Sequence, residues 1–195
     1  MKNITNIFMI LFLLIFTINI SAQEEGEEMS AEMKAWMEYM TPGWAHEMMA
    51  KSAGEWTAEN TMWEYPGAEP MKSGGKVKNE MILGGRYLQA THSGTVMGMP
   101  FEGLNLSGYD NHTKKFISIW IDNMGTGISK SEGTYDKKTN SINFTGNMID
   151  PVTGKNMTYR SVAKMIDDDH QEFVMYMKDK DGKEFKSFIM KYTRK

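Results

Sequence analysis

The stretch GMPFEGLNLSGYD (residues 98–110) holds three glycines among thirteen residues, although the apolar and aromatic residues between them are typical of a β-strand. Glycine weakens a strand because it loses the most conformational freedom on folding and packs no side chain. Strands of a small closed barrel tolerate it where they must bend sharply. Glycine also leaves room for crowded interior side chains, or for a ligand that approaches the backbone. We expect curvature to be the main reason, so the stretch predicts a bent strand of a closed barrel.

Alternation of apolar and polar residues continues from Gly54 almost to the C-terminus, interrupted by turn signals such as Gly84-Gly85 and Asp110-Asn111. The pattern predicts strands at residues 54–65, 72–83, 86–97, 101–110, 115–122, 127–135, 141–149, 155–166, 171–178 and 184–193. The connections are too short for the helical crossovers that parallel strands require. The sequence therefore predicts a mainly β fold, an antiparallel up-and-down barrel of about ten strands.

The N-terminus has the pattern of a secretory signal peptide, with a charge at Lys2, an apolar run over residues 7–20 and small residues at 21–22. The run is short for a membrane-spanning helix, which needs about 20 apolar residues. We therefore expect cleavage, export to the periplasm or the medium, and no membrane span in the mature protein. The alternative is a retained membrane anchor.

Four segments follow from these patterns. They are a signal peptide at residues 1–22, an acidic linker at 23–29, an N-terminal helical segment at 30–53 and a barrel domain at 54–195. Ser30 and Thr41 are candidate N-caps within the helical segment. Pro42 divides that segment into one or two short helices.

Composition limits the classes of function. The formal net charge of −3 and the lack of a basic stripe predict no nucleic-acid binding. The chain has no cysteine, which excludes disulfides and thiolate metal sites. It has 20 methionines, which suit irregular packing, an adaptable ligand cavity, or Cu(I) binding through thioethers. Met33, Met37 and Met40 would be the copper ligands, but a helix that packs on a barrel explains the same stripe and is our preferred interpretation.

No catalytic constellation is evident, so we do not expect an enzyme. None of the four histidines is paired at metal-ligand spacing, and no serine lies in a G-x-S-x-G motif. His92 is the only histidine within an expected strand. It is the one candidate axial ligand for haem, although we favour a structural strand histidine. Any enzymatic activity would use His92 or Asp122.

Two resemblances support the barrel. Gly54-Glu55-Trp56 at the start of the first strand and Arg194 after the last are similar to the lipocalin-like, or calycin, pattern, in which the arginine packs across the tryptophan and closes one end of the barrel. The stretches TPGWAHEMMAKSAGEW, MILGGRYL, FISIWIDNMGT and a final Tyr-x-Arg resemble a family of exported bacterial proteins that share a domain of unknown function. That resemblance spans about residues 41–194, and it implies a lipocalin-like barrel after a short helix, with no activity attached.

The barrel predicts a function in binding a small, largely apolar ligand inside. Candidate lining residues are Arg86, Tyr87, His92, Tyr109, Trp120, Asp122, Tyr159 and Tyr176. The main alternative is a structural or protein-interaction module, with a filled barrel and a Met/Trp-rich helical contact surface. Binding of haem or Cu(I) comes third.

The segment FISIWID (residues 116–122) leaves one question open, because its three isoleucines share one face and Trp120 and Asp122 share the other. If the isoleucines face inward, the interior is apolar. If Trp120 and Asp122 face inward, the buried carboxylate needs a partner, which Arg86 or Arg160 could supply.

Overall fold

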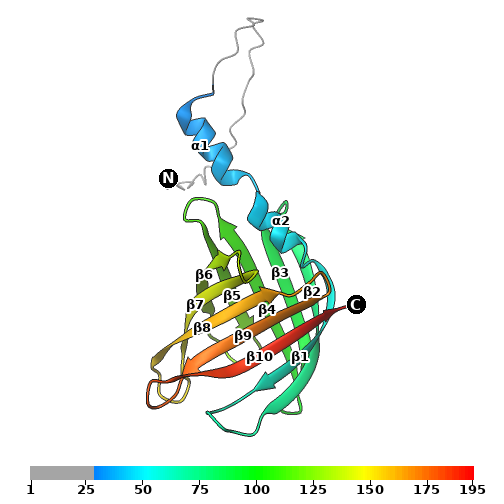
Figure 1. Cartoon of the computed structure of the whole chain (residues 1–195), viewed down its shortest axis with the longest axis vertical. Coiled ribbons are helices and arrows are strands. Elements are labelled where there is room, and N and C mark those ends of the chain that lie inside the picture. The colour runs from blue at the N-terminus through cyan, green and yellow to red at the C-terminus, as the bar shows by residue number, and fades with distance from the viewer. Residues whose placement is uncertain (1–28) are drawn as a thin grey trace, which may run out of the picture.

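The computed structural model describes residues 29–195 and shows a closed barrel behind two short helices (Figure 1). The helices are α1 (Ala31–Met40) and α2 (Trp44–Ala50). The strands are β1 (Gly54–Met62), β2 (Met71–Ile82), β3 (Tyr87–Val96), β4 (Met99–Asp110), β5 (Lys115–Asp122), β6 (Ser129–Asp136), β7 (Ser141–Ile149), β8 (Asn156–Met165), β9 (His170–Lys178) and β10 (Glu184–Arg194). The predicted signal peptide and most of the predicted linker lie outside the described residues.

Each strand pairs antiparallel with the next, and β10 pairs with β1 to close the barrel. In the closing pair, Trp56 lies opposite Arg194. The predicted fold class, an antiparallel up-and-down barrel of about ten strands, is confirmed. The largest difference is that β1 ends at Met62, three residues before the predicted boundary at residue 65.

The lumen of the barrel is defined by the alternation of burial along each strand. In β1, Trp56 and Ala58 are buried while the residues beside them are exposed. Residues that pair across neighbouring strands face the same side of the sheet, so the register identifies the inward residues of every strand. In β5 it places Phe116, Ser118, Trp120 and Asp122 inward, and the three isoleucines outward. The open question at residues 116–122 is thereby answered.

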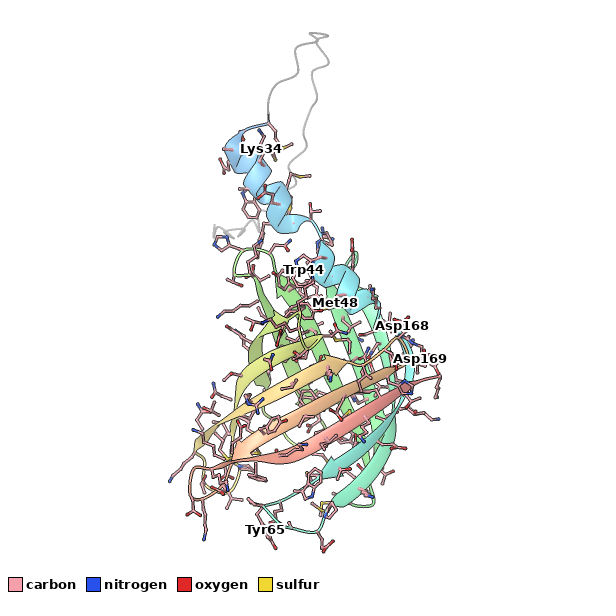
Figure 2. The ribbon with its side chains drawn as sticks, in the orientation of Figure 1. Lys34, Trp44, Met48, Tyr65, Asp168 and Asp169 are labelled. Carbon is pink, nitrogen blue, oxygen red and sulfur yellow. The ribbon has the colours of Figure 1, made fainter. Side chains whose placement is uncertain are left out.

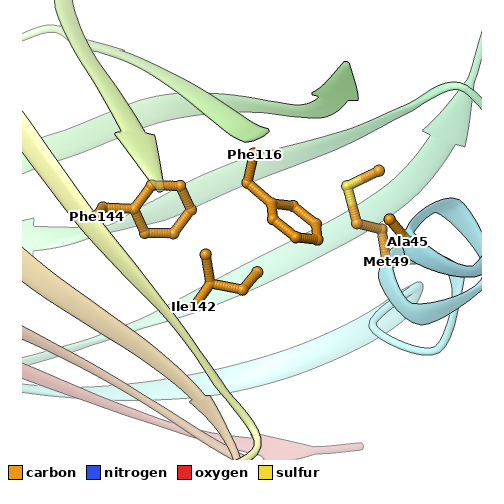
Figure 3. Close-up of a cluster of buried hydrophobic side chains, with 5 residues drawn as sticks. All are labelled: Ala45, Met49, Phe116, Ile142 and Phe144. Atoms are coloured by element: carbon orange, nitrogen blue, oxygen red, sulfur yellow. The ribbon is translucent and has the colours of Figure 1, made fainter. Parts of the chain in front are cut away.

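One end of the barrel is closed by α2. Ala45 and Met49 of α2 pack against Phe116, Ile142 and Phe144, which point inward from β5 and β7 (Figure 3). Trp44 and Met48 of α2 lie at the same end, whereas Tyr65, between β1 and β2, lies at the opposite end (Figure 2). A second cluster of buried residues runs along β1, β2, β3 and β10: Trp56, Ala58, Val77, Ala90 and Met190.

The helix α1 extends away from the barrel and buries none of its side chains (Figure 1). Its stripe of Met33, Trp36, Met37 and Met40 is about half exposed, so the expectation that this stripe packs on the barrel is wrong. The reason is that α1 ends at Met40. Only the next helix, α2, lies across the end of the barrel. Ser30 caps α1 as expected, since its side chain accepts a hydrogen bond from the Met33 amide.

The N-cap of α2 is Gly43, not Thr41. The His46 side chain takes over the capping role, because its Nδ1 accepts a hydrogen bond of 3.0 Å from the Gly43 amide. Burial of His46 lowers its pKa, which keeps Nδ1 available as an acceptor. No helix in the described part of the chain is long and apolar enough to cross a membrane.

Candidate functional site

The lumen wall formed by β4 and β5 is polar. Asn105, Ser107 and Ser118 point inward and are half-buried. The Asn105 amide group donates to Ser118 Oγ at 2.7 Å, and the Ser107 hydroxyl donates to Asn105 Oδ1 at 2.7 Å. On the other face of the same strands, Leu104 and Leu106 point outward beside the isoleucines of β5. In the middle of these two strands, polar groups thus face the lumen and apolar groups face outside, although Phe116 and Trp120 also face the lumen on either side of Ser118.

Trp120 lies flat against this wall. A Cβ added at Gly103 would lie 2.6 Å from the Trp120 indole ring, so the glycine makes room for the ring. The indole Nε1 donates to Asp122 Oδ2 at 2.6 Å, which fixes the ring in this position. Phe101 stacks beside Trp120, with the ring centroids 6.3 Å apart and the planes 18° apart.

Two further inward rings lie over glycines of a neighbouring strand. A Cβ at Gly133 would lie 2.6 Å from the Phe144 ring, and one at Gly146 would lie 2.5 Å from the Tyr159 ring. The Tyr159 hydroxyl is hydrogen-bonded to Ser129 at 2.8 Å. These rings occupy the space that the missing side chains would take, so they lie close against the wall of the barrel.

The glycines of residues 98–110 therefore have a different main role from the one expected. Gly98 adopts a φ of 79° in the turn between β3 and β4, a conformation that favours glycine. Gly103 lies under Trp120 on the inner face. Gly108 lies under Tyr87 on the outer face, where an added Cβ would be 2.8 Å from the ring. Room for aromatic rings explains the two strand glycines directly, whereas curvature was the expected reason.

His92 lies in the lumen beside Trp120, with the ring centroids 5.0 Å apart at an angle of 80°. It is only 7% exposed, and its side chain makes no hydrogen bond to any other residue of the described chain. Burial lowers the pKa of His92 to about 4, so the imidazole is uncharged at neutral pH. It stays available as one hydrogen-bond donor and one acceptor.

A small cavity of about 20 Å³ adjoins His92, and Asn60, Phe101 and Met190 also line it. This volume is enough for one water molecule. The Asn60 amide nitrogen donates to Ser73 at 3.2 Å, whereas the buried Asn60 Oδ1 has no partner. Two uncharged polar side chains thus meet the same cavity with hydrogen-bonding capacity unused.

The predicted lining residues fall into two groups. His92, Trp120, Asp122 and Tyr159 face the lumen, and so does Tyr109, at the closed end against Trp44 and Phe116. Tyr87 and Tyr176 face outward, and Arg86 lies in a turn, so these three do not line the lumen.

Neither arginine proposed as a partner of Asp122 reaches it. Arg86 Nη2 donates to the Met40 carbonyl at 2.9 Å, which ties the end of α1 to the barrel. Arg160 pairs with Glu184 at 2.7 Å and lies over the Tyr176 ring on the outer face. The Asp122 carboxylate is satisfied instead by Trp120 Nε1 and by the Met124 amide at 2.9 Å.

Sequence reasoning missed the inward residues Asn60, Asn105, Ser107 and Ser118. Each is a small polar residue, and in Asn105 and Ser118 it alternates with leucines or isoleucines, a pattern that ordinarily marks the solvent face of a strand. The only available signal was their position on the same strand face as a candidate aromatic residue, as Ser118 is with Trp120.

The residues expected to close the barrel meet at the α2 end. The Arg194 guanidinium carbon lies 4.1 Å from the centroid of the Trp56 ring. Its nitrogens donate to the carbonyls of Ala53, Lys51 and Asp168 at 2.7, 2.7 and 2.9 Å. Asp168 and Asp169 lie beside this end in the β8–β9 turn (Figure 2).

A separate hollow of about 840 Å³ lies on the outer face of β6 and β7, away from the lumen. Its lining is mainly polar, and ion pairs of 3.2 Å join Glu132 to Lys115 and to Lys130 within it. Among residues 29–195, no three histidine, aspartate or glutamate side chains come together as a metal site.

The closed ten-stranded barrel, its helix-capped end and its inward aromatic residues define the class as lipocalin-like. Residues 41–194 match the family described as "Protein of unknown function (DUF1579)", and the chain belongs to this family. No curated protein matches the chain in sequence.

Two solved structures share the fold. One is Rv2717c from M. tuberculosis, at 14% sequence identity and a TM-score of 0.59, covering 80% of this chain and 99% of that one. The other is the S-type phycobiliprotein lyase CPES from Guillardia theta, at 9% identity and a TM-score of 0.53, covering 82% and 96%. At these identities the similarity establishes the fold alone.

Proposed function

We propose that the protein binds a small ligand inside its barrel, entering from the end opposite α2. The observation that carries this proposal is the distribution of side chains in the middle of β4 and β5. There the strands place Leu104, Leu106 and three isoleucines outside, and place polar side chains in the lumen. Polar groups in a dry, filled core would cost stability without contributing apolar packing. A lumen that admits water or a ligand makes the same arrangement favourable.

The ligand has an apolar body and at least one hydrogen-bonding group. Trp120, Phe173, Met175 and Phe188 offer partly accessible apolar surface to the body. Asn105, Ser118 and their neighbours offer hydrogen bonds from β4 and β5, beside Trp120. Pockets of this kind, mostly apolar with a few placed polar groups, are typical of small-molecule sites. The similarity to a phycobiliprotein lyase agrees with a lumen that accommodates a small molecule.

The test is native mass spectrometry of the protein purified from its own host, followed by denaturation and analysis of what is released. We expect a stoichiometric small molecule on the wild type. We expect none on Ser118→Leu, which places a bulky side chain in the lumen. Thr145→Leu, an outward change on β7, is the matched control and should retain the ligand. A haem or a copper ion would appear in the same spectrum by its mass.

A bare wild-type mass, together with no binding of added amphiphiles, would overturn the proposal. It would favour the second candidate function, a protein-interaction module. That candidate rests on the exposed stripe of α1, in which Met33 and Trp36 are 52% and 54% exposed. A photo-crosslinking residue at Met37 would then give one discrete protein adduct in the host, and one at Thr145 would not.

A further inference from the structure

The charges of the described strands are segregated between the two faces of the barrel. Every lysine on a strand occupies an outward position, as Lys78, Lys115 and Lys130 do in their ion pairs. Arg160 points outward, and Arg194 is hydrogen-bonded to the Ala53 carbonyl at the closed end. Among the inward side chains of these strands, the one carboxylate is that of Asp122. The lumen therefore offers no cation to a ligand and presents one negative charge.

The polar groups that remain free in the lumen are uncharged. Asn60 Oδ1 is a buried acceptor without a partner, and the neutral His92 imidazole provides one donor and one acceptor. Both line the same cavity of about 20 Å³. A group of one oxygen atom fits this volume. A hydroxyl there donates to Asn60 Oδ1 and accepts from His92, so the free acceptor of Asn60 and the donor of His92 are both used.

A carboxylate fits the same place poorly. It has no proton to donate to Asn60 Oδ1, which would stay unpartnered, and two oxygens exceed the space available. Its negative charge would be buried without a cation and near that of Asp122, which is hydrogen-bonded to the indole beside His92. Burial of an unpaired charge is costly.

We propose that the barrel selects ligands with an uncharged polar head, a hydroxyl held between Asn60 and His92, and excludes carboxylates. The inference rests on the ligand-binding function proposed above and specifies the chemistry of its ligand. It distinguishes neutral amphiphiles, such as alcohols, from fatty acids of the same chain length.

The probes are 1-octanol and octanoate, titrated at pH 7 into protein labelled with ¹³C in its methionine methyl groups. Met190 lines the cavity and Met175 lies on the lumen wall, whereas Met33 of α1 is 52% exposed, lies outside the barrel and serves as the control. Met190→Leu assigns the Met190 signal. We expect octanol to shift the Met190 and Met175 signals with at least tenfold higher affinity than octanoate, and to leave the Met33 signal unchanged.

Two variants separate selection by these residues from the lower solubility of octanol in water. Asn60→Leu removes the free acceptor and should weaken octanol about tenfold while leaving octanoate unchanged. Asp122→Asn keeps an acceptor for Trp120 Nε1 but removes the charge, and should strengthen octanoate severalfold without affecting octanol. Asn143→Leu, on the outer face of β7, is the control and should change neither affinity.

Equal binding of the two probes, or an affinity ratio that neither Asn60→Leu nor Asp122→Asn changes, would overturn the inference and leave the ligand-binding function standing. If neither probe shifts any lumen methionine, the inference and the proposed function both fail.

Discussion

Single glycines decide where the inward aromatic rings can lie, and Gly146 offers the clearest test. An added Cβ would be 2.5 Å from the Tyr159 ring and 2.8 Å from Ser131 Cβ, so one of them must move. We expect Gly146→Ala to lower the free energy of unfolding by about 1–3 kcal/mol, the usual cost of overpacking. Urea unfolding followed by tryptophan fluorescence measures it.

The control for Gly146 is Gly127→Ala. An added Cβ there meets nothing within 4 Å, so this substitution should change the stability by less than about 0.5 kcal/mol. In a Tyr159→Leu background the cost of Gly146→Ala should shrink, because the ring that it displaces is gone. An undiminished cost in that background would show that the ring is not what Gly146 accommodates.

His92 should make the stability depend on pH. Burial lowers its pKa to about 4 in the folded protein, whereas the unfolded chain binds the proton near pH 6.5. His92 therefore does not reduce the free energy of unfolding above pH 6.5, where it is neutral in both states. Its effect lowers that free energy progressively as the pH falls to 4. We expect the loss over this window to be up to about 3 kcal/mol greater in the wild type than in His92→Gln.

The measurement is the free energy of unfolding in urea at intervals from pH 7 to pH 4. Carboxylates such as Asp110 and Asp167, whose pKa values are lowered by hydrogen bonds, also destabilise the fold as they are protonated, so the difference between the two proteins is what counts. His112→Gln, in an exposed turn, should follow the wild type. Parallel curves for the wild type and His92→Gln would contradict the expectation.

At the scale of the elements, the C-terminus of β10 holds α2 and β1 together. The Arg194 guanidinium spans three backbone carbonyls and covers Trp56. A lysine cannot reproduce this planar fork. We expect Arg194→Lys to cost about 2–4 kcal/mol of stability, since hydrogen bonds from charged donors contribute more than neutral ones. Thermal unfolding measures the cost.

Arg160→Lys is the matched control on the neighbouring face. Its ion pair with Glu184 is 40–45% exposed, and exposed pairs contribute at most about 1 kcal/mol. Equal effects of the two substitutions would mean that Arg194 is an ordinary surface charge. Hydrogen exchange of residues 51–53 should also rise in Arg194→Lys, because two of the carbonyls that it holds belong to this connection.

The elements also show how far sequence periodicity predicts this structure. Alternation and turn signals predict all ten strands, because each strand keeps one face buried and each connection is short. Periodicity says nothing of which face is inside. In the middle of β4 and β5, around Asn105 and Ser118, the more apolar face is the outer one, so the rule that apolar residues point inward fails there. The register with β3, which places His92 opposite Gly103, decides the facing.

At the scale of the whole molecule, the barrel is a closed unit, and α1 lies outside it without burying any side chain. Closure depends on contacts between the two ends of the chain, so the G-x-W motif and Arg194 predict it better than any local pattern does. The exposed stripe of α1 was predicted to pack, because helical spacing shows that a face is apolar but does not identify what covers it. The connections of α1 to the barrel are hydrogen bonds from Arg86 and Asn111 to its last carbonyls.

Removal of all residues before Thr41 should therefore leave the barrel intact. The truncation discards α1, which buries no side chain, and keeps α2, the Asn111 hydrogen bond to the Thr41 carbonyl at 2.8 Å, and the packed end of the lumen. We expect its free energy of unfolding to lie within about 1 kcal/mol of that of a chain comprising residues 23–195. The lumen methionine signals should be unchanged as well.

Removal of residues 1–50 is the contrasting variant, because it takes Ala45 and Met49 out of the buried cluster and should cost several kcal/mol. If the shorter truncation destabilises the barrel as much as the longer one, then α1 is part of the folded unit, and its apolar stripe stabilises the protein in a way that the exposure of its side chains does not reveal.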